Sequence, residues 1–330
     1  MEIAFERLGV ALETTPGTAE ANPTHYLPIA GRVAPRQTVY RPEEARGTRE
    51  QYYRSAIVKR WSEWEGEGPL DTYNLPVLLA MAVDGNVTPT TPTGATNARL
   101  WTFTRSPVAV TEKTGTLFYG DPNIQIWRAP YGAVQSFTIS ADASGDDGVT
   151  MEVSGVARTM ESVSAPTWPA QLVGPIVTPI QSQLWLDTTS PIGTTAITGR
   201  VVSAEFSVDG LRGDPKFLFA GPSATKTFER LGVAKTAATL QLTMEVFDLN
   251  QFNLLMNEAV VRARLRMNGP EIEAGFNHFV EIDIVGVFDE PDWTEVFGSN
   301  VALSVTITSQ YDATLGYGWA IRVQNDRTTL

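Results

Sequence analysis

Apolar and polar residues alternate over many short stretches of the chain, and this pattern predicts a protein built mainly of β-strands. In residues 202–208 and 239–246 every second side chain is apolar, as expected for a strand with one buried and one exposed face. Similar runs predict further strands over residues 58–68, 134–141, 149–156, 279–287 and 301–309. The 27 glycines and 21 prolines punctuate many short segments, which fits elements joined by turns.

Two stretches have helical spacing instead. Residues 71–83 and 248–260 each begin with an aspartate, and their apolar residues recur every three or four positions. This spacing predicts one helix in each stretch, with a single buried stripe that lies on a sheet. Asp71 and Asp248 are expected to cap the helices, and Asn74 is a competing cap in the first because Pro76 fits only a first turn.

The same series of signals occurs twice along the chain. A Thr-Thr turn, a strand, a long polar stretch, a second strand, a helix and a closing pair of strands appear in each half, and Asp71 maps on Asp248 at an offset of 177. A stretch with four prolines, residues 165–179, separates the halves as an extended and stiff linker. We therefore predict two tandem copies of one domain, residues 1–172 and 173–330.

One repeat lies outside this scheme. The segment 5–11 recurs letter for letter as residues 228–234, at an offset of 223 rather than 174 to 177. The sequence offers no physical reason for it.

Composition excludes several kinds of protein. The net charge of −12 opposes binding to duplex DNA or to anionic membranes, and the absence of cysteine rules out disulfides and thiol chemistry. His25 and His278 are the only histidines, so a histidine site would not be duplicated. No apolar run approaches the roughly 20 residues of a membrane span, and no secretion signal precedes the first strand. We expect no catalytic residue, no cofactor, no metal and no membrane contact, and a cytosolic site of synthesis.

Strand parity gathers the carboxylates on polar faces. Glu63, Glu65 and Glu67 share one face of a strand. Further acids lie opposite apolar neighbours, namely Glu205, Glu245, Glu281 and Asp283. Such a set fits a metal or acid–base cluster, a solvated face that blunts aggregation, or a surface that repels nucleic acid. The basic stretch Arg262, Arg264 and Arg266 also alternates with apolar residues, and it is interpreted as a solvated or partner-facing stripe.

Two polar stretches, residues 41–56 and 209–227, are too long for hairpin turns, so we expect them to project as loops. They are rich in residue types common at protein interfaces: Arg46, Arg49, Tyr52, Tyr53, Arg54, Arg212, Lys216, Phe217 and Phe219.

The order of elements resembles that of the tail tube proteins of siphophages, whose tails are long and non-contractile. The resemblance rests on the turn 13–18, the strand and helix over 64–83, and the strand pair 132–158 with its turn at 145–148. It implies a mainly β fold with flanking helices, in which two tandem tail-tube-type β-sandwich domains of the Hcp-like kind carry one helix each. In that family, inner sheets join side by side into a barrel around a lumen, and the long loops stack one ring on the next. The duplication resembles the variant in which three chains supply six domains, so the resemblance implies a homotrimeric, pseudo-hexameric ring.

The resemblance also implies roles and partners. The seven carboxylates named above would line the lumen, and the nine loop residues would make ring-to-ring contacts. The chain would bind copies of itself, a tape measure protein in the lumen before ejection, and tail terminator and distal tail proteins at the tube ends. Double-stranded DNA would pass without sticking. The protein would be a virion component of the tail, assembled in the cytoplasm of the bacterial host.

Two alternatives remain open from sequence. Another β-rich virion component, such as a capsid decoration or baseplate hub protein, would share the sandwich without forming a tube. A β-sandwich hydrolase or lectin is a second alternative, against which the missing signal peptide and the unduplicated histidines argue. Electron microscopy of the purified protein, which would show rings or tubes, separates these possibilities.

Overall fold

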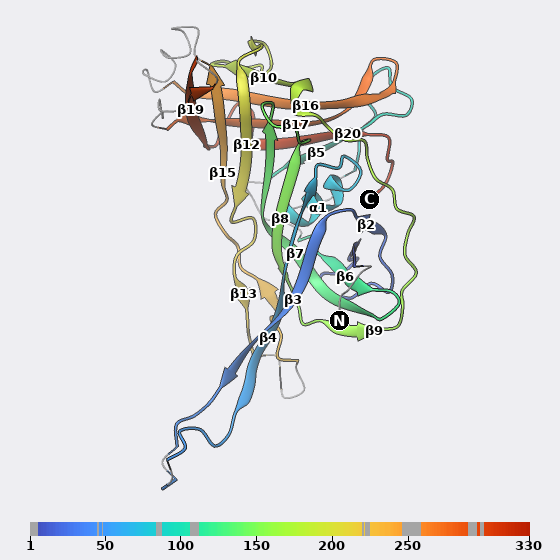
Figure 1. Ribbon diagram of the computed structural model, residues 1–330, viewed down its shortest axis with the longest axis vertical. Helices are drawn as coiled ribbons and strands as arrows, with labels where there is room; N and C mark the ends of the chain where they lie inside the picture. The colour runs from blue at the N-terminus through green and yellow to red at the C-terminus, as the bar shows by residue number, and fades with distance from the viewer. Residues whose placement is uncertain are drawn as a thin grey trace.

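The structure is a computed structural model that describes residues 6–44, 46–47, 49–83, 88–105, 112–219, 221, 225–245, 259–289, 296–297 and 300–330. Within these ranges the protein is mainly β, as predicted, with one α-helix, α1 (Leu75–Ala82), and a short 3-10 turn, η1 (Pro179–Gln181). The helix predicted over 248–260 falls almost entirely outside the described residues. Figure 1 shows an elongated body with an extended ribbon at one end.

The strands of the first half are β1 (Arg7–Leu12), β2 (His25–Leu27), β3 (Ala30–Tyr40), β4 (Ala56–Pro69), β5 (Arg99–Thr104), β6 (Gly115–Asp121), β7 (Gln125–Asp142), β8 (Thr150–Ala157) and β9 (Glu161–Val163). Those of the second half are β10 (Ser182–Asp187), β11 (Ala196–Ile197), β12 (Val201–Asp209), β13 (Pro215–Lys216), β14 (Arg230–Leu231), β15 (Ala237–Glu245), β16 (Val261–Glu273), β17 (Phe276–Phe288), β18 (Val296–Phe297), β19 (Asn300–Ser309) and β20 (Trp319–Asn325).

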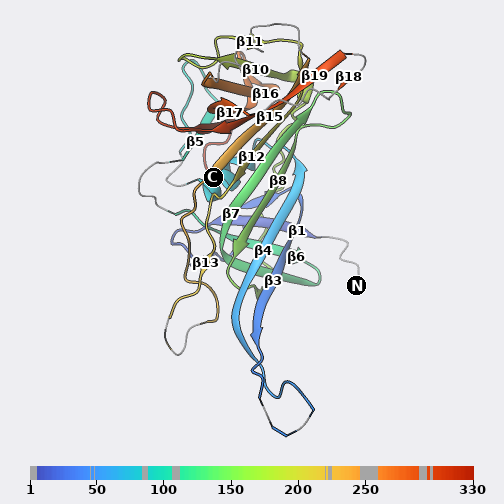
Figure 2. The ribbon, with the colours of Figure 1, turned by 90° about the vertical axis from the view of Figure 1, so that its left-hand side faces the viewer.

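One large antiparallel sheet runs through both halves of the chain. Its strands pair in the order β3–β4–β8–β7–β12–β15–β19. The junction between the halves is the β7–β12 pair, in register from Phe137↔Val208 to Asp142↔Ser203. Figure 2 shows β4, β7, β8, β12 and β15 running along the length of the molecule. The two halves therefore share one continuous sheet.

A second layer covers this sheet in each half. The first part of β7 pairs with β6 and β9, and β6 continues to β1 and β2. In the second half β17 pairs with β16 and β20, and β16 continues to β10 and β11, while the end of β17 joins β19. The two halves thus repeat one order of strand pairing. In the first half the order is β2–β1–β6–β7–β8–β4–β3, and in the second half it is β11–β10–β16–β17–β19–β15–β12. β9 and β20 occupy corresponding places.

Two strands depart from the expectations of the sequence. β5 belongs to the first half but pairs with β20 of the second, from Arg99↔Asn325 to Thr104↔Ala320. β20 in turn pairs with β17, so it lies inside a sheet between β17 and β5. The halves are therefore tied together by a strand pair in addition to the β7–β12 junction.

The helix α1 lies against β7 and β5 between the layers, and all of its residues are buried rather than one stripe. The N-cap residue is Asn74, and its side chain makes no capping hydrogen bond. Asp71 instead orders the approach to the helix: its carboxylate accepts hydrogen bonds from Tyr73 N at 2.8 Å, Asn74 Nδ2 at 2.7 Å and Gly174 N at 2.9 Å. The start of α1 is thereby fixed to the linker between the halves.

Candidate functional site: a polar sheet face and a projecting arm

The face of the large sheet that points away from the core is polar along its upper rows, whereas in the row of Glu63 the apolar Val156 and Ala133 are covered by Phe228 and Leu231. On β4 the three predicted carboxylates, Glu63, Glu65 and Glu67, point away from the core, whereas Trp64 between the first two points into it and is buried. Glu67 lies directly across from Glu152 of β8, whose next neighbour on β7 is a threonine. The row continues into the second half through Ser207, Thr239 and Thr308.

Hydroxyl groups and carboxylates make up the next rows as well. Glu205 of β12 lies between Ser140 of β7 and Gln241 of β15, and Glu245 ends the polar face of β15. Five of the seven predicted carboxylates, Glu63, Glu65, Glu67, Glu205 and Glu245, therefore share one sheet face.

In the strand segments named next, basic residues on this face occur only on the edge strand β3. β8, β12, β15 and β19 contain no lysine or arginine, and neither do residues 62–69 of β4 or 129–142 of β7. The edge strand β3 carries Arg32 and Arg36, and each forms an ion pair of 2.7 Å, with Glu65 and Glu63 respectively. The arginines are thus matched by acids, and the remaining width of the face is acidic or neutral. We call it the acidic face.

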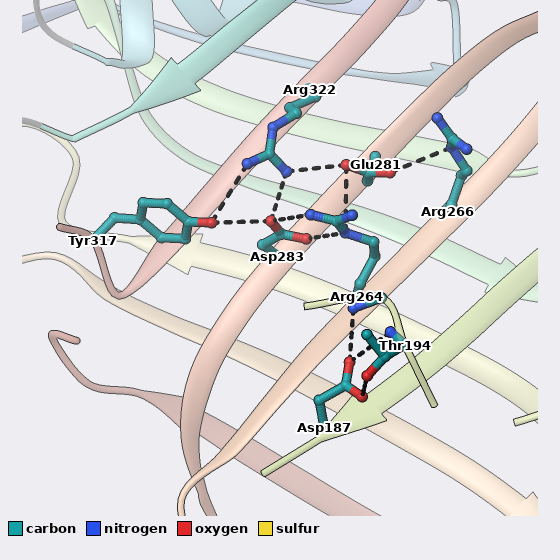
Figure 3. Close-up of polar contacts among 9 residues, drawn as sticks. Asp187, Thr194, Arg264, Arg266, Glu281, Asp283, Tyr317 and Arg322 are labelled. Carbon is teal, nitrogen blue, oxygen red and sulfur yellow. Dashed lines mark hydrogen bonds and ion pairs between the residues drawn. The ribbon is translucent and has the colours of Figure 1, made fainter. Parts of the chain in front are cut away.

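Glu281 and Asp283 lie elsewhere, in an ion-pair network on β16, β17 and β20 (Figure 3). Asp283 is fully buried, and its carboxylate accepts hydrogen bonds from Arg264 Nε at 2.7 Å, Arg322 Nη1 at 2.6 Å and Tyr317 Oη at 3.1 Å. Burial alone raises the pKa of Asp283, but hydrogen bonds and charge from the two arginines outweigh burial and hold that pKa below its ordinary value.

The same network accounts for the basic stripe of β16. Glu281 lies 3.0 Å from Arg322 Nη1 and 3.3 Å from Arg266 Nε, and Arg262 pairs with Asp312. The stripe therefore faces acids of its own chain, and the charges of Glu281 and Asp283 are compensated there. These two residues stabilise the second layer, and only the other five carboxylates remain candidates for a charged surface.

Each half carries a buried carboxylate that holds a turn, a role that the sequence reading missed. Glu13 accepts hydrogen bonds from Gly17 N at 2.6 Å, Thr116 Oγ1 at 2.8 Å and Tyr131 N at 2.8 Å. In the corresponding turn of the second half, Asp187 accepts bonds from Gly193 N at 2.7 Å, Thr195 N at 2.8 Å and the Thr194 hydroxyl. The available signal was an acid directly before Thr-Thr in both halves.

Asp187 makes stability depend on pH. Burial raises its pKa, but the hydrogen bonds from Thr194, Thr195 and Gly193 prevail and lower that pKa to about 2. A lowered pKa contributes stability above pH ~3.8, and this contribution is lost as the pH falls through ~2. Asp187→Asn is therefore expected to cost about 2 kcal/mol near neutral pH and nothing below pH ~2. Urea unfolding from pH 2 to 7 measures the difference in free energy of unfolding between the wild type and this variant, with exposed Asp147→Asn as the control. A difference that stays constant across this range would contradict the prediction.

The first predicted loop projects from the body, as expected. Beyond Ser62 the strand β4 has no partner in β8, and β3 and β4 continue as a two-stranded ribbon that ends in residues 41–55 (Figures 1 and 2). We call residues 36–61 the arm. Within its tip, Glu44 pairs with Arg46 and with Arg54, each at 2.6 Å, and the Arg46 guanidinium lies 5.1 Å above the ring of Tyr53. Arg49 and Tyr52 are exposed.

The second predicted loop, residues 209–227, does not stand free of the body in its described part, because the β13–β14 pair that it contributes to packs on the first half. Arg212 is buried, and Phe217 is half-buried with its ring 6.0 Å from that of Trp61. Of the four predicted contact residues in this loop, only Lys216 and Phe219 are exposed. The reason is Phe228, which is fully buried against the first half with its ring 5.3 Å from Tyr131. The segment thus lies along its own chain.

Other kinds of site find little support in the described ranges. No group of three or more His, Asp or Glu side chains there could hold a metal ion. In the same part of the chain, no helix is long and apolar enough to cross a membrane. The polar features that stand out are the acidic face and the arm.

A continuous acidic sheet face, an edge strand β3 that pairs only with β4 among the described strands, and a projecting arm are features of a protein that assembles with copies of itself. The model of one protein family, described as phage tail tube protein, matches residues 6–277. The chain belongs to the phage tail tube protein family. No curated protein matches it.

As a tail tube protein, the chain is a structural component of the phage tail that self-assembles into a tube. The resemblance to phage tail tube proteins, deduced from the turn 13–18, the segment 64–83 and the strand pair 132–158, is thereby confirmed at the level of the family. The matched region contains β3, β4, β7, β8, β12 and β15, and therefore the arm and the part of the acidic face that these strands form, whereas β19, β20 and nearly all of β17 lie outside it.

Proposed function

We propose that three copies of this chain close into a ring, that rings stack into the tube of a siphophage tail, and that the acidic face lines the conduit for the genome. The observation that supports this most strongly is the β7–β12 junction, which fuses two halves into one sheet without an edge between them. A ring of such sheets, closed chain to chain, is a barrel with an inner and an outer surface.

The repeated order of strand pairings supports two tandem units, residues 1–172 and 173–330. In that order β3 of the first half corresponds to β12 of the second. β12 pairs with β15 on one side and β7 on the other, whereas β3 pairs only with β4 among the described strands. β3 also contains Pro35, which lacks an N–H and is tolerated at a sheet edge.

An open edge in a body of this size needs a partner, and a second copy supplies it. In the repeated order, β17 is the counterpart of β7 and β3 is the counterpart of β12. Because β12 lies beside β7 within the chain, β3 of one chain would lie beside β17 of the next chain. This contact is head-to-tail and joins unlike surfaces, so it closes into a ring when the rotation per chain divides a full turn. With two units per chain, three chains give six units and true threefold symmetry.

The acidic face suits an inner wall that must not bind DNA. Carboxylates repel phosphates, whereas lysine or arginine would release counterions on contact and hold the duplex. Glu63, Glu65, Glu67, Glu205 and Glu245 are the proposed lumen residues. A tape measure protein in the lumen, a terminator and a distal tail protein at the ends, and assembly in the bacterial cytoplasm complete the proposal, in which the chain has no enzymatic role.

The direct test is electron microscopy of the purified protein, combined with its mass in solution. We expect hollow tubes or rings of three chains, with Glu65, Glu67 and Glu205 on the inner wall. A map with these side chains on the outer wall would sink the lumen assignment. Discrete globular assemblies without a central channel would instead favour another virion component, such as a capsid decoration or baseplate hub protein.

A further inference from the structure

The two corresponding strand hairpins of the chain end differently. In the second half, the β12–β15 ladder stops at Asp209↔Ala237, and β19 supports β15 nearly to that point through Thr239↔Thr308. In the first half, β3 and β4 continue past the end of β8 as far as Tyr40↔Ala56. The first hairpin projects as the arm, whereas in its described residues the second continues beyond the β12–β15 ladder as the short β13–β14 pair, Pro215↔Leu231 and Lys216↔Arg230.

The segment between β12 and β15 packs against the first half of the chain. We call its described residues 211–219 and 225–234 the brace. Arg158 of the first half donates hydrogen bonds to two brace carbonyls, Phe228 O at 2.9 Å and Glu229 O at 2.7 Å. Phe228 and Leu231 form a small buried cluster with Tyr131, Ala133 and Val156 of the first half. These contacts anchor the brace to the body.

The brace also contacts the base of the arm, residues 59–61 of β4. Arg60 N donates a hydrogen bond of 2.7 Å to Lys226 O. The ammonium group of Lys59 lies 4.9 Å from the ring centre of Phe217, and the indole of Trp61 meets that ring edge-on. Residues 59–61 of β4 thus gain a neighbour at the place where β8 has ended.

We propose that the brace fixes the direction in which the arm points, so that the arm is held ready to meet a second copy of this chain in the next ring. The proposal rests on the proposed tube. A two-stranded ribbon without further support is marginally stable in water, so an unbraced arm would sample many directions. Holding it in one direction before contact lowers the ordering cost of stacking.

Contacts within the chain order the arm tip before it meets a partner. Glu44 holds Arg46 and Arg54, Gln51 Nε2 donates to Glu43 at 2.8 Å, and Glu43 forms an isolated bridge with Tyr52. On this ordered frame Tyr40 and Tyr52 are 59% and 48% exposed. Rigid, exposed tyrosines among arginines are typical of residues that become buried when proteins associate.

The test compares three variants with the wild type in tube assembly. Phe217→Ala removes the ring that contacts Lys59 and Trp61, Phe217→Tyr keeps it, and Tyr52→Ser changes only the exposed tip. We expect Phe217→Ala and Tyr52→Ser to form rings of normal mass but to need about tenfold more protein for tubes, because ordering the arm or losing its contact weakens stacking. Phe217→Tyr should behave as wild type. Arg128→Ala, which breaks the remote pair with Glu161, is the control for loss of a surface contact.

The outcomes separate the two proposals. If the wild type forms neither rings nor tubes, the proposed function fails. If it forms tubes and Phe217→Ala forms them equally well, with an unchanged melting temperature, the role of the brace is refuted. A map of the tube should show three arms crossing between successive rings. Arms that contact only their own ring would overturn the assignment of the partner.

Discussion

Replacing Glu67, Glu152 and Glu205 together by lysine is expected to turn a tube that releases duplex DNA into one that retains it. All three side chains are exposed on the acidic face, on the neighbouring strands β4 and β8 and on β12 beyond the junction. The change removes three negative charges per chain and adds three positive ones. Since no side chain there enters the core, rings and tubes should still form.

The retained DNA should depend steeply on salt. Each phosphate neutralised on duplex DNA contributes a slope of about −0.9 to log K against log salt. With about three contacts per chain, a fourfold fall in salt raises the binding constant about 40-fold. Co-sedimentation of preformed tubes with short duplexes that fit the channel, at ~50 and ~200 mM salt, measures this.

A matched triple variant isolates the sign of the charge. Glu67→Gln, Glu152→Gln and Glu205→Gln remove the same acids without adding cations, so little counterion release follows and no retention is expected. Wild-type tubes should also bind nothing. If the glutamine tubes retain as much DNA as the lysine tubes, an inner position for these residues is contradicted. The same holds if neither variant retains DNA.

Much of the mainly β fold is encoded locally and was therefore predictable. In β12 and β15 every second residue is buried, and the alternation of Ala204, Phe206 and Val208 with polar neighbours is visible in sequence alone. The same parity placed Glu63, Glu65 and Glu67 together. Parity states which residues share a face of one strand, and this information needs no knowledge of the neighbours.

Parity does not state which strands lie side by side. Glu205 and Asp283 have the same pattern in sequence, yet one lies on the acidic face and the other is buried against Arg264 and Arg322. Only the β16–β17 register, with Arg264 opposite Asp283, distinguishes them. The pairing of β5 with β20 joins residues more than 200 positions apart and leaves no local signal either.

The repeated heptapeptide shows the same limit. In β1 its residues Leu8 and Val10 are buried in the main core, whereas the second occurrence lies in the brace. There Leu231 is buried, but the residue that matches Val10, Val233, is 97% exposed. Identical letters thus serve a central strand and a surface segment, because tertiary contacts override local preference.

Phe206→Ala is expected to cause the largest loss of stability among single changes in the junction. Phe206 is fully buried in β12, and its ring lies 5.9 Å from Phe137 of β7 and 6.2 Å from Trp319 of β20. Phe137 and Trp319 also touch, with ring centres 6.5 Å apart. Truncating a buried phenylalanine to alanine costs about 3–5 kcal/mol, from lost burial and from the cavity that remains.

The variant also tests whether the halves unfold as one unit. The aromatic trio joins β7, β12 and β20, and the β5–β20 pair ties the halves a second time, so the wild type should unfold in a single transition. Weakening the junction should lower the melting temperature and separate two transitions, because each half keeps its own second layer. Calorimetry on unassembled protein measures both effects, with exposed Phe219→Ala as the same-residue control, for which a change below about 0.5 kcal/mol is expected. Two transitions in the wild type, or equal effects of the two variants, would show that the junction does not couple the halves.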